Sequence, residues 1–265
     1  MFVANPYLKR IGYTGPKSPT PDLLRTLHRS HLFSVPFENL DIAFGRKIVC
    51  EEQFFLNKIV DRHRGGFCYE LNGAFAALLR ALSFHVTLLS ARVPREDGSQ
   101  TPEFDHLTLR VDLEEPWPAD VGFGDCFLSP LRLDVRAEQA QDGRKYCITE
   151  EAEALHVERA ESDGAWRRQY SFCLTPHTLD DFADMCHYHQ TSPESPFTRK
   201  TLCTLATPDG RITLSDWKLI LTSKGSREER ILESAQEWRK VLKSFFGIDL
   251  DPELAPSSAT VPAES

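Results

Sequence analysis

The sequence predicts an α+β fold in which a helical first third precedes an antiparallel sheet or barrel and then a mixed third region. Hydrophobic residues recur at helical spacing up to about residue 83, and from Phe84 they alternate with a period of two. The strand-like segments that follow are short and closely spaced, which is typical of antiparallel sheets and barrels.

The composition is that of an ordinary globular protein, with 265 residues, 41% of them hydrophobic, and a net charge of −8. The acidic balance argues against a nucleic-acid-binding surface, which would normally carry a basic excess. Seven scattered cysteines without a Cys-x-x-Cys pair favour free thiols over a disulfide framework or a zinc site. Without a signal-peptide pattern or a membrane-spanning apolar run, we expect a cytoplasmic protein with no membrane partner.

Helices are predicted throughout the first third of the chain. Thr20-Pro21-Asp22 combines an N-cap, a first-turn proline and an acidic residue, and so begins a helix. Pro36 ends this helix, because the residue before a proline avoids the helical conformation. The predicted helices cover residues 5–11, 21–33 and 51–62, followed by one that begins near Cys68.

Strands dominate the middle of the chain, at residues 84–93, 105–113, 118–123, 145–149, 154–158 and 166–174. A helix over residues 178–189 follows them. The third region contains predicted strands at 201–207, 211–214 and 217–222, and a long helix over 228–246 that Gly247 ends.

These patterns divide the chain into four parts. Residues 1–83 form a helical bundle, residues 84–192 the sheet or barrel, and residues 193–250 the mixed region. The segment 251–265 is rich in proline, alanine and serine, and we expect it to be disordered.

The most informative stretch surrounds Cys68, which follows Arg64-Gly65-Gly66-Phe67 and precedes a stripe of apolar residues at helical spacing. The two glycines allow a tight turn or a close backbone approach. Cys68 therefore lies at a helix N-terminus, where unpaired N–H groups and the helix dipole favour a thiolate. A thiolate is a nucleophile, so a base and an orienting carboxylate are expected elsewhere in the chain.

His106 and Asp120 meet that expectation. His106 lies on the polar face of a predicted strand, and Asp120 interrupts an apolar segment, where a charge is costly unless it is paired. We predict that Asp120 bonds one ring nitrogen of His106 and that the other nitrogen faces Cys68. Each residue alone has a structural alternative, namely a buried cysteine, a hydrogen-bonded histidine and a turn-capping aspartate, so the catalytic hypothesis depends on all three together.

Five motifs in order resemble the arylamine N-acetyltransferase family. They are Ser34-Val35-Pro36-Phe37-Glu38-Asn39-Leu40, Arg64-Gly65-Gly66-Phe67-Cys68-Tyr69-Glu70-Leu71-Asn72, Ala91-Arg92-Val93, His106-Leu107 and Asp120-Val121-Gly122-Phe123-Gly124. The resemblance runs from about residue 5 to about residue 215, and beyond that only the layout matches. The block around Cys68 is highly specific to this family.

The resemblance implies a triad of Cys68, His106 and Asp120 within a helical bundle, a β-barrel and a C-terminal α/β lid. It implies acetyl-CoA as co-substrate, no metal, and a ping-pong reaction through acetyl-cysteine. The acceptors would be aromatic amines, arylhydrazines or N-hydroxyarylamines. Phe37 and the pair Val93 and Phe123 match positions that line the acceptor pocket, whereas the family's coenzyme contacts cannot be carried over.

Other functions use the same residues and stay open at this point. A hydrolase or transglutaminase-like enzyme uses a Cys-His-Asp triad with another acceptor, and an amide synthase that closes macrolactams is an offshoot of the same family. A non-catalytic binding protein would not need all three triad residues. For the polar residues Glu38, Asn39, Arg64 and Glu70 we expect structural roles, as an internal salt bridge of Arg64 and hydrogen bonds between bundle and barrel.

Overall fold

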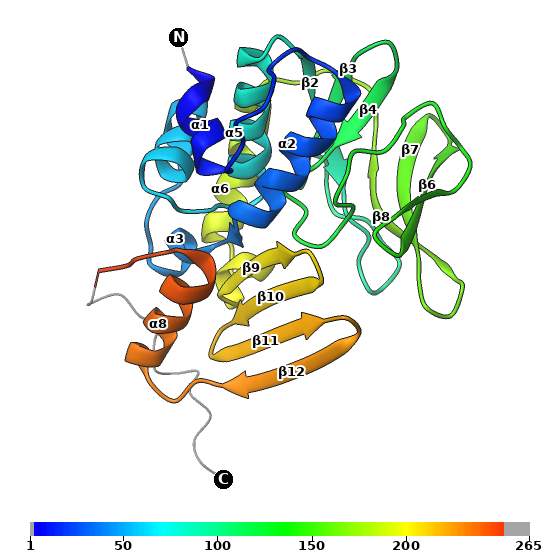
Figure 1. Cartoon of the computed structure of the whole chain (residues 1–265). Helices are drawn as coiled ribbons and strands as arrows, with labels where there is room; N and C mark the ends of the chain where they lie inside the picture. The colour runs from blue at the N-terminus through cyan, green and yellow to red at the C-terminus, as the bar shows by residue number, and fades with distance from the viewer. Residues whose placement is uncertain (1–2, 252–265) are drawn as a thin grey trace.

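The computed structural model of the chain describes residues 3–251, which fold into helices and two antiparallel sheets (Figure 1). Except for Asp251, the segment 251–265, which we expected to be disordered, lies outside these residues. The helical elements are α1 (Ala4–Arg10), α2 (Pro21–Ser34), α3 (Leu40–Ala43), α4 (Glu52–Leu56), the π-helical η1 (Asn57–Asp61), α5 (Cys68–Ala81), the 3-10 helix η2 (Leu179–Phe182), α6 (Ala183–Thr191), α7 (Pro196–Arg199) and α8 (Ala235–Phe246).

The larger sheet of the described chain has the strand order β4-β3-β2-β8-β7-β6-β5, with every neighbouring pair antiparallel. Its strands are β2 (His85–Arg92), β3 (His106–Asp112), β4 (Pro116–Ala119), β5 (Gln139–Gln141), β6 (Arg144–Glu151), β7 (Ala154–Ala160) and β8 (Trp166–Phe172). The prediction of successive antiparallel strands is therefore confirmed.

This sheet curls into a half-barrel, where the sequence predicted a sheet or barrel and the family resemblance implied a β-barrel. Its open side is filled by an irregular segment that bonds β4 through the backbones of Leu131 and Leu133, whose N–H groups donate to the carbonyls of Pro118 and Pro116. Because the two prolines lack N–H groups, β4 offers this segment carbonyl oxygens but no donors at those positions. A regular additional strand is therefore excluded at this edge.

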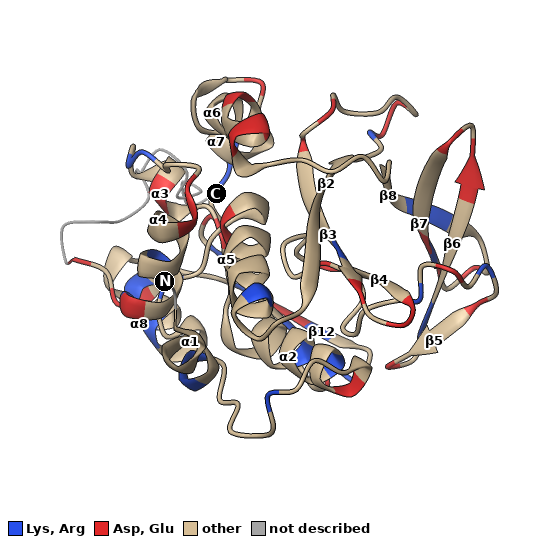
Figure 2. Cartoon of the chain, turned by 90° about the horizontal axis from the view of Figure 1, so that it is seen from above, with Lys and Arg blue, Asp and Glu red and all other residues tan. Residues whose placement is uncertain are grey.

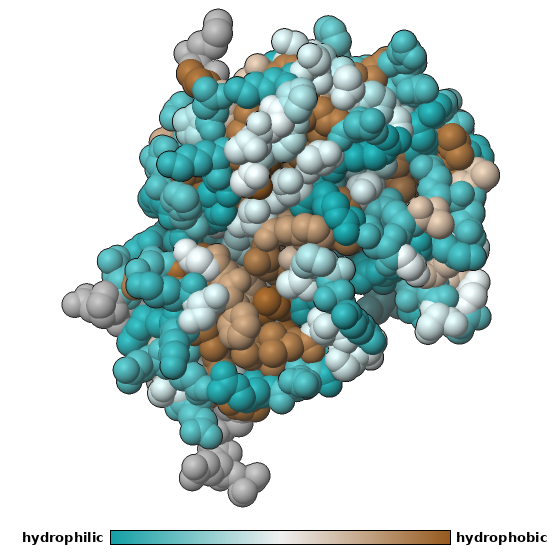
Figure 3. Space-filling model, viewed as in Figure 1, coloured by the Kyte–Doolittle hydropathy of each residue, from teal (hydrophilic) through white to brown (hydrophobic). Residues whose placement is uncertain are grey.

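The smaller sheet joins the first third of the chain to the last third. Its order is β1-β9-β10-β11-β12, and β1, from the first third, pairs with β9 so that Phe37 lies opposite Thr204. Figure 3 shows hydrophobic surface over this sheet, next to the part that α8 covers. The strands are β1 (Phe37–Glu38), β9 (Leu202–Thr207), β10 (Gly210–Ser215), β11 (Lys218–Ser223) and β12 (Ser226–Ile231).

Helix α5 is the centre of the molecule, between the other N-terminal helices and strands β2 and β3 (Figure 2). Every residue from Cys68 to Leu79 is buried, and one hydrophobic cluster joins the helices to strands β2–β4. The predicted apolar stripe is confirmed, but the helix is buried on its other faces too, because small residues let neighbours approach. A Cβ on Gly73 would lie 2.7 Å from the Phe55 ring. The bundle thus shares a core with strands β2–β4, whereas strands β6–β8 of the half-barrel pack in a second hydrophobic cluster.

The prediction for residues 228–246 is wrong in its first part. The helix predicted over 228–246 begins only at Ala235, and residues 226–231 form the edge strand β12. A two-residue turn at Lys224 and Gly225, both with positive φ, starts this hairpin, and the Ser234 side chain caps α8 by accepting from the backbone N–H of Glu237. Among residues 3–251, no helix has both the length and the apolar character to cross a membrane.

Candidate active site

Cys68 is the first residue of α5, as predicted. The chain before it runs beside the segment that leads into β1, and the two glycines are needed for this close approach rather than for positive φ. A Cβ on Gly65 would lie 1.9 Å from the Pro36 carbonyl oxygen, and one on Gly66 would lie 2.6 Å from Cβ of Glu70. The Glu70 carboxylate accepts from the Phe67 N–H at 3.1 Å and so caps the helix directly before Cys68.

A cavity of about 380 Å³ opens above Cys68. It is lined by Cys68 and His106, and also by the predicted pocket residues Phe37, Val93 and Phe123. These residues come from α5, β3, β1 and the loops after β2 and β4, so the structure brings together positions that are far apart in sequence. A cavity of this size with aromatic walls suits a flat aromatic molecule.

Asp120 lies behind His106, fully buried directly after β4. Its Oδ2 is 2.6 Å from Nε2 of His106, so the predicted pairing of these two side chains is present. Burial alone would raise the pKa of Asp120, but His106 and the hydrogen bonds from Asn72 and Gly122 outweigh it and hold the pKa below its ordinary value. Asp120 is therefore an anion at neutral pH, and its bond to Nε2 leaves Nδ1 as the other ring nitrogen of His106.

Asn72, one turn along α5 from Cys68, clamps the Asp120 loop. Its amide nitrogen donates to Oδ1 of Asp120 at 2.9 Å and to the Leu107 carbonyl at 2.6 Å, and its oxygen accepts from the Val121 N–H at 2.9 Å. The sequence analysis missed this role. The sequence signal for this role was an amide side chain one helical turn after Cys68, on the same face of the predicted helix.

The electrostatics of Cys68 differ from the prediction. Burial raises the pKa of its thiol well above the ordinary value, and the carboxylates of Asp105 and Asp120 raise it further, whereas hydrogen bonds with the backbones of Leu107 and Tyr69 lower it. Burial therefore outweighs the helix start, and the helix start alone does not make Cys68 a thiolate. A buried thiolate here needs a cation beside it, and His106 lines the same cavity.

Known proteins resemble this chain over nearly its whole length. A family model described as N-acetyltransferase matches residues 20–255. An arylamine N-acetyltransferase of Gallus gallus, the pineal gland isozyme NAT-10, is 34% identical over 94% of this chain and 95% of its own. That of Escherichia coli strain K12 is 32% identical over 94% and 90%. The chain belongs to the arylamine N-acetyltransferase family.

Solved structures agree with this membership, which makes the protein an acetyltransferase. The structure of the arylamine N-acetyltransferase from Salmonella typhimurium matches with a TM-score of 0.88 at 31% identity, covering 92% of this chain and 90% of that one. The enzyme from Mycobacterium marinum in complex with CoA matches with a TM-score of 0.85 at 30% identity, covering 92% of each chain. The resemblance seen in the sequence motifs is confirmed.

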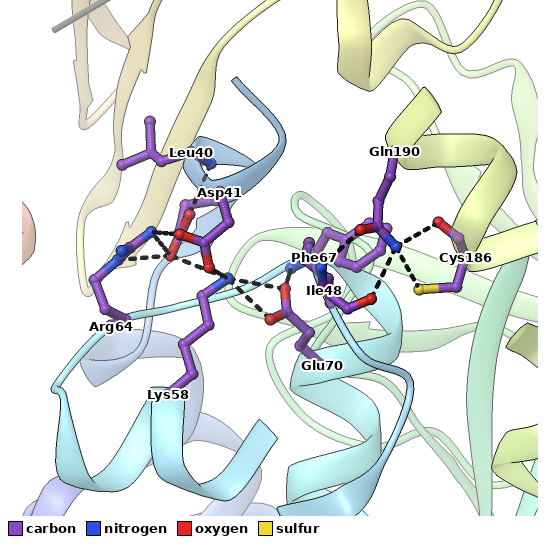
Figure 4. A network of polar contacts seen from close by, with 10 residues as sticks. Leu40, Asp41, Ile48, Lys58, Arg64, Phe67, Glu70, Cys186 and Gln190 are labelled. Carbon is purple, nitrogen blue, oxygen red and sulfur yellow. Dashed lines mark hydrogen bonds and ion pairs between the residues drawn. The ribbon is translucent and has the colours of Figure 1, made fainter. Parts of the chain in front are cut away.

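At the start of α5, next to Cys68, lies a buried ionic network (Figure 4). The Lys58 ammonium is 2.9 Å from Glu70 and 2.8 Å from Asp41, and Arg64 is 2.8 Å from Glu38 and 3.2 Å from Asp41. The expected internal salt bridge of Arg64 is thus present. The expected link from these acids to the barrel is wrong, because their partners lie within the first third of the chain.

The cavity of the acetyltransferase has a polar rim that the sequence analysis missed. His189 of α6 is 3.2 Å from the Asp105 carboxylate and bonds the hydroxyl of Ser195, also at 3.2 Å. Asp105 and His189 line the cavity together with Phe197 of α7. Cys186, His187 and His189 are close in sequence, as metal ligands often are, but within residues 3–251 no three candidate ligands are grouped for a metal.

Proposed function

We propose that the protein transfers an acetyl group from acetyl-CoA to aromatic amines and arylhydrazines, and to the oxygen of N-hydroxyarylamines, by a ping-pong reaction through acetyl-Cys68. The observation that carries this proposal is the buried His106–Asp120 pair at 2.6 Å, with His106 and Cys68 lining one aromatic cavity. The CoA complex of the Mycobacterium marinum relative supports acetyl-CoA as the donor.

In the first half-reaction, Nδ1 of His106 takes the proton of the Cys68 thiol, and the thiolate attacks the carbonyl carbon of the thioester. The carbon–sulfur bond to CoA then breaks, and the leaving CoA sulfur takes the proton from His106. Asp120 stabilises the imidazolium in between and keeps the ring oriented. The products are free CoA and acetyl-Cys68.

In the second half-reaction, the acceptor nitrogen attacks the acetyl carbon and His106 takes its proton. The bond to the Cys68 sulfur breaks, the proton passes to that sulfur, and the acetylated amine leaves. The walls formed by Phe37, Phe123 and Phe197 would hold the acceptor ring by stacking and burial.

We further propose that residues 193–250 act as a lid on this cavity. Residues 1–83, the helical bundle, and residues 84–192, the half-barrel, would be the other two functional units of the chain. Supporting this, α7 brings Pro196 and Phe197 to the cavity. The Phe197 ring lies 6.1 Å from the ring of Phe37 and 5.8 Å from that of Phe67.

Intact mass spectrometry tests the proposal. We expect acetyl-CoA alone to add one acetyl group to the wild type and none to the Cys68→Ala variant. Aniline or phenylhydrazine should then discharge the adduct, whereas cyclohexylamine, a matched amine without an aromatic ring, should discharge it much more slowly. CoA release without any adduct would instead favour a hydrolase, and an adduct on Cys68→Ala would refute the assignment of the nucleophile.

A further inference from the structure

His28 of α2 is fully buried behind the proposed triad. Its Nδ1 is 3.0 Å from the Leu128 carbonyl oxygen, and its Nε2 is 3.1 Å from the backbone nitrogen and 3.0 Å from the carbonyl oxygen of Asp120. Phe127 stacks on the ring at 5.6 Å and Phe75 meets it edge-on at 6.0 Å. The ring is therefore held in its plane with both nitrogens against backbone groups.

The tautomer with its hydrogen on Nδ1 satisfies two of these three backbone contacts, whereas a hydrogen on Nε2 would serve only the Asp120 carbonyl. The Leu128 carbonyl can only accept, so the hydrogen of the neutral ring lies on Nδ1. Nε2 then carries the lone pair and accepts from the Asp120 N–H. Burial lowers the pKa of His28 to about 4, so the ring stays neutral and keeps this acceptor at neutral pH.

The bond to the Asp120 N–H matters because β4 ends at Ala119, the last residue paired with β3. Asp120 lies just beyond the ladder. Its carboxylate is fixed by Asn72, Gly122 and His106, while its backbone N–H is fixed by His28. The direction in which the carboxylate leaves the chain thus depends on a residue 92 positions away.

We propose that His28 is a positioning residue for acetyl transfer, which holds the backbone of Asp120 so that its carboxylate meets His106. This inference rests on the proposed function. It predicts that loss of the bond at Nε2 slows the formation of acetyl-Cys68, whereas loss of the bond at Nδ1 alone does not.

Two amide substitutions separate these bonds. The glutamine amide reaches the position of Nε2, and the asparagine amide reaches that of Nδ1. We expect His28→Gln to keep most of the wild-type rate of acetyl-Cys68 formation, and His28→Asn to lose about 100-fold, the typical effect of a displacement of roughly 1 Å at a catalytic group. Both variants should lose similar amounts of thermal stability, so stability alone cannot explain the difference in rate.

His31 offers a matched control, because it is equally buried on the same helix but bonds the Tyr7 hydroxyl at 2.9 Å. His31→Asn should lower Tm and leave the rate within a few-fold of wild type. Equal rates in His28→Gln and His28→Asn, or an equal loss in His31→Asn, would overturn the proposal.

Nitrogen NMR of the wild-type His28 ring tests the proposal even if no variant folds, since a hydrogen on Nε2 would overturn the bond from the Asp120 N–H on which the proposal depends. A wild type that forms no acetyl-Cys68 would instead refute the proposed function, and the NMR result would still stand on its own.

Discussion

The proposed chemistry depends on the negative charge of the Asp120 carboxylate. This carboxylate accepts hydrogen bonds from Asn72, Gly122 and His106. In Asp120→Asn, the amide cannot stabilise the imidazolium or hold the same tautomer. We expect formation of acetyl-Cys68 to slow by about 10⁴-fold, as the equivalent change does in serine proteases. Rapid-quench mass spectrometry measures this, and a loss below tenfold with intact circular dichroism would contradict the role of Asp120.

The same residues show what sequence reasoning can and cannot reach. Asp120 was predictable because a charge within an apolar segment must find a partner. His28 and Asn72 were missed because their bonds go to backbone groups of distant segments, and no local pattern marks such bonds. The raised pKa of Cys68 was missed because the burial of the helix start depends on the packing of the whole core.

Helix α5 begins against the ionic network, in which three carboxyl groups face two cations. With one acid in excess, burial raises the pKa of Glu70 from 4.5 to about 7, although Lys58 opposes this shift and Glu38 adds to it. Between these two pH values the folded protein holds a proton that the unfolded chain has lost. The free energy of unfolding should therefore fall as pH rises from about 4.5 to 7, by roughly 3 kcal/mol from this group.

Urea denaturation between pH 4.5 and 8 tests this contribution. Glu70→Gln keeps an acceptor for the Phe67 N–H but cannot titrate, so its stability should fall less with pH than that of the wild type. Glu103→Gln is the matched control, because Glu103 forms an exposed ion pair with Arg92. A slope of Glu70→Gln equal to that of the wild type would show that Glu70 does not carry the excess proton.

The turn after β4 meets α5 so closely that Gly122 has no room for a side chain. A Cβ there would lie 2.9 Å from both Cα and the carbonyl oxygen of Cys68, and 2.7 Å from the amide nitrogen of Asn72. Gly122→Ala should therefore displace the nucleophile and slow acetyl-Cys68 formation about 100-fold. Gly124→Ala is the control, since Gly124 has φ of +92° and open space around it. It should cost roughly 1–2 kcal/mol of stability and little rate, and a slower Gly124→Ala would contradict this account.

Helices and strands were predicted correctly where one local sequence signal dominates, and incorrectly where pairing with a neighbouring strand determines the structure. The start of α5 follows from the glycines and the apolar stripe. Residues 228–231 of the edge strand β12 were assigned to a helix because Ile231 and Leu232 extend the apolar pattern of the helix that follows. Residues 228–231 instead pair with β11, and β12 as a whole has six paired positions with that strand. The charged side chains of β12 protect its exposed edge from pairing with another chain.

At the scale of the whole molecule, the cavity lies where distant parts of the chain meet. Phe37 comes from the first third, Val93 and His106 from the half-barrel, and Phe197 from the last third. The sequence predicted these parts in order but not the hydrophobic cluster that joins the helices to strands β2–β4, because contacts between segments far apart in the chain leave no periodic pattern. The cavity therefore depends on residues that fasten the parts to one another.

Asn39 is such a residue. Its buried amide donates to the carbonyls of Phe197 at 2.9 Å and Lys200 at 2.7 Å, and its oxygen accepts from the Leu202 N–H at 2.7 Å. Asn39→Ala leaves these backbone groups without their partner, so we expect a loss of about 3 kcal/mol in the free energy of unfolding. Because Phe197 is held less firmly, KM for aniline should rise, while acetyl-Cys68 formation should change much less.

Denaturation and steady-state kinetics measure both effects of Asn39→Ala. Asn57→Ala is the matched control, because Asn57 bonds Asp61 at 3.1 Å at the exposed surface, and it should change stability by less than about 0.5 kcal/mol. If Asn39→Ala lost stability but kept its KM for aniline, the wall formed by Phe197 would not depend on this anchor. The acceptor site would then be fixed by the first two thirds of the chain, and the lid proposed for the C-terminal part would lose its main support.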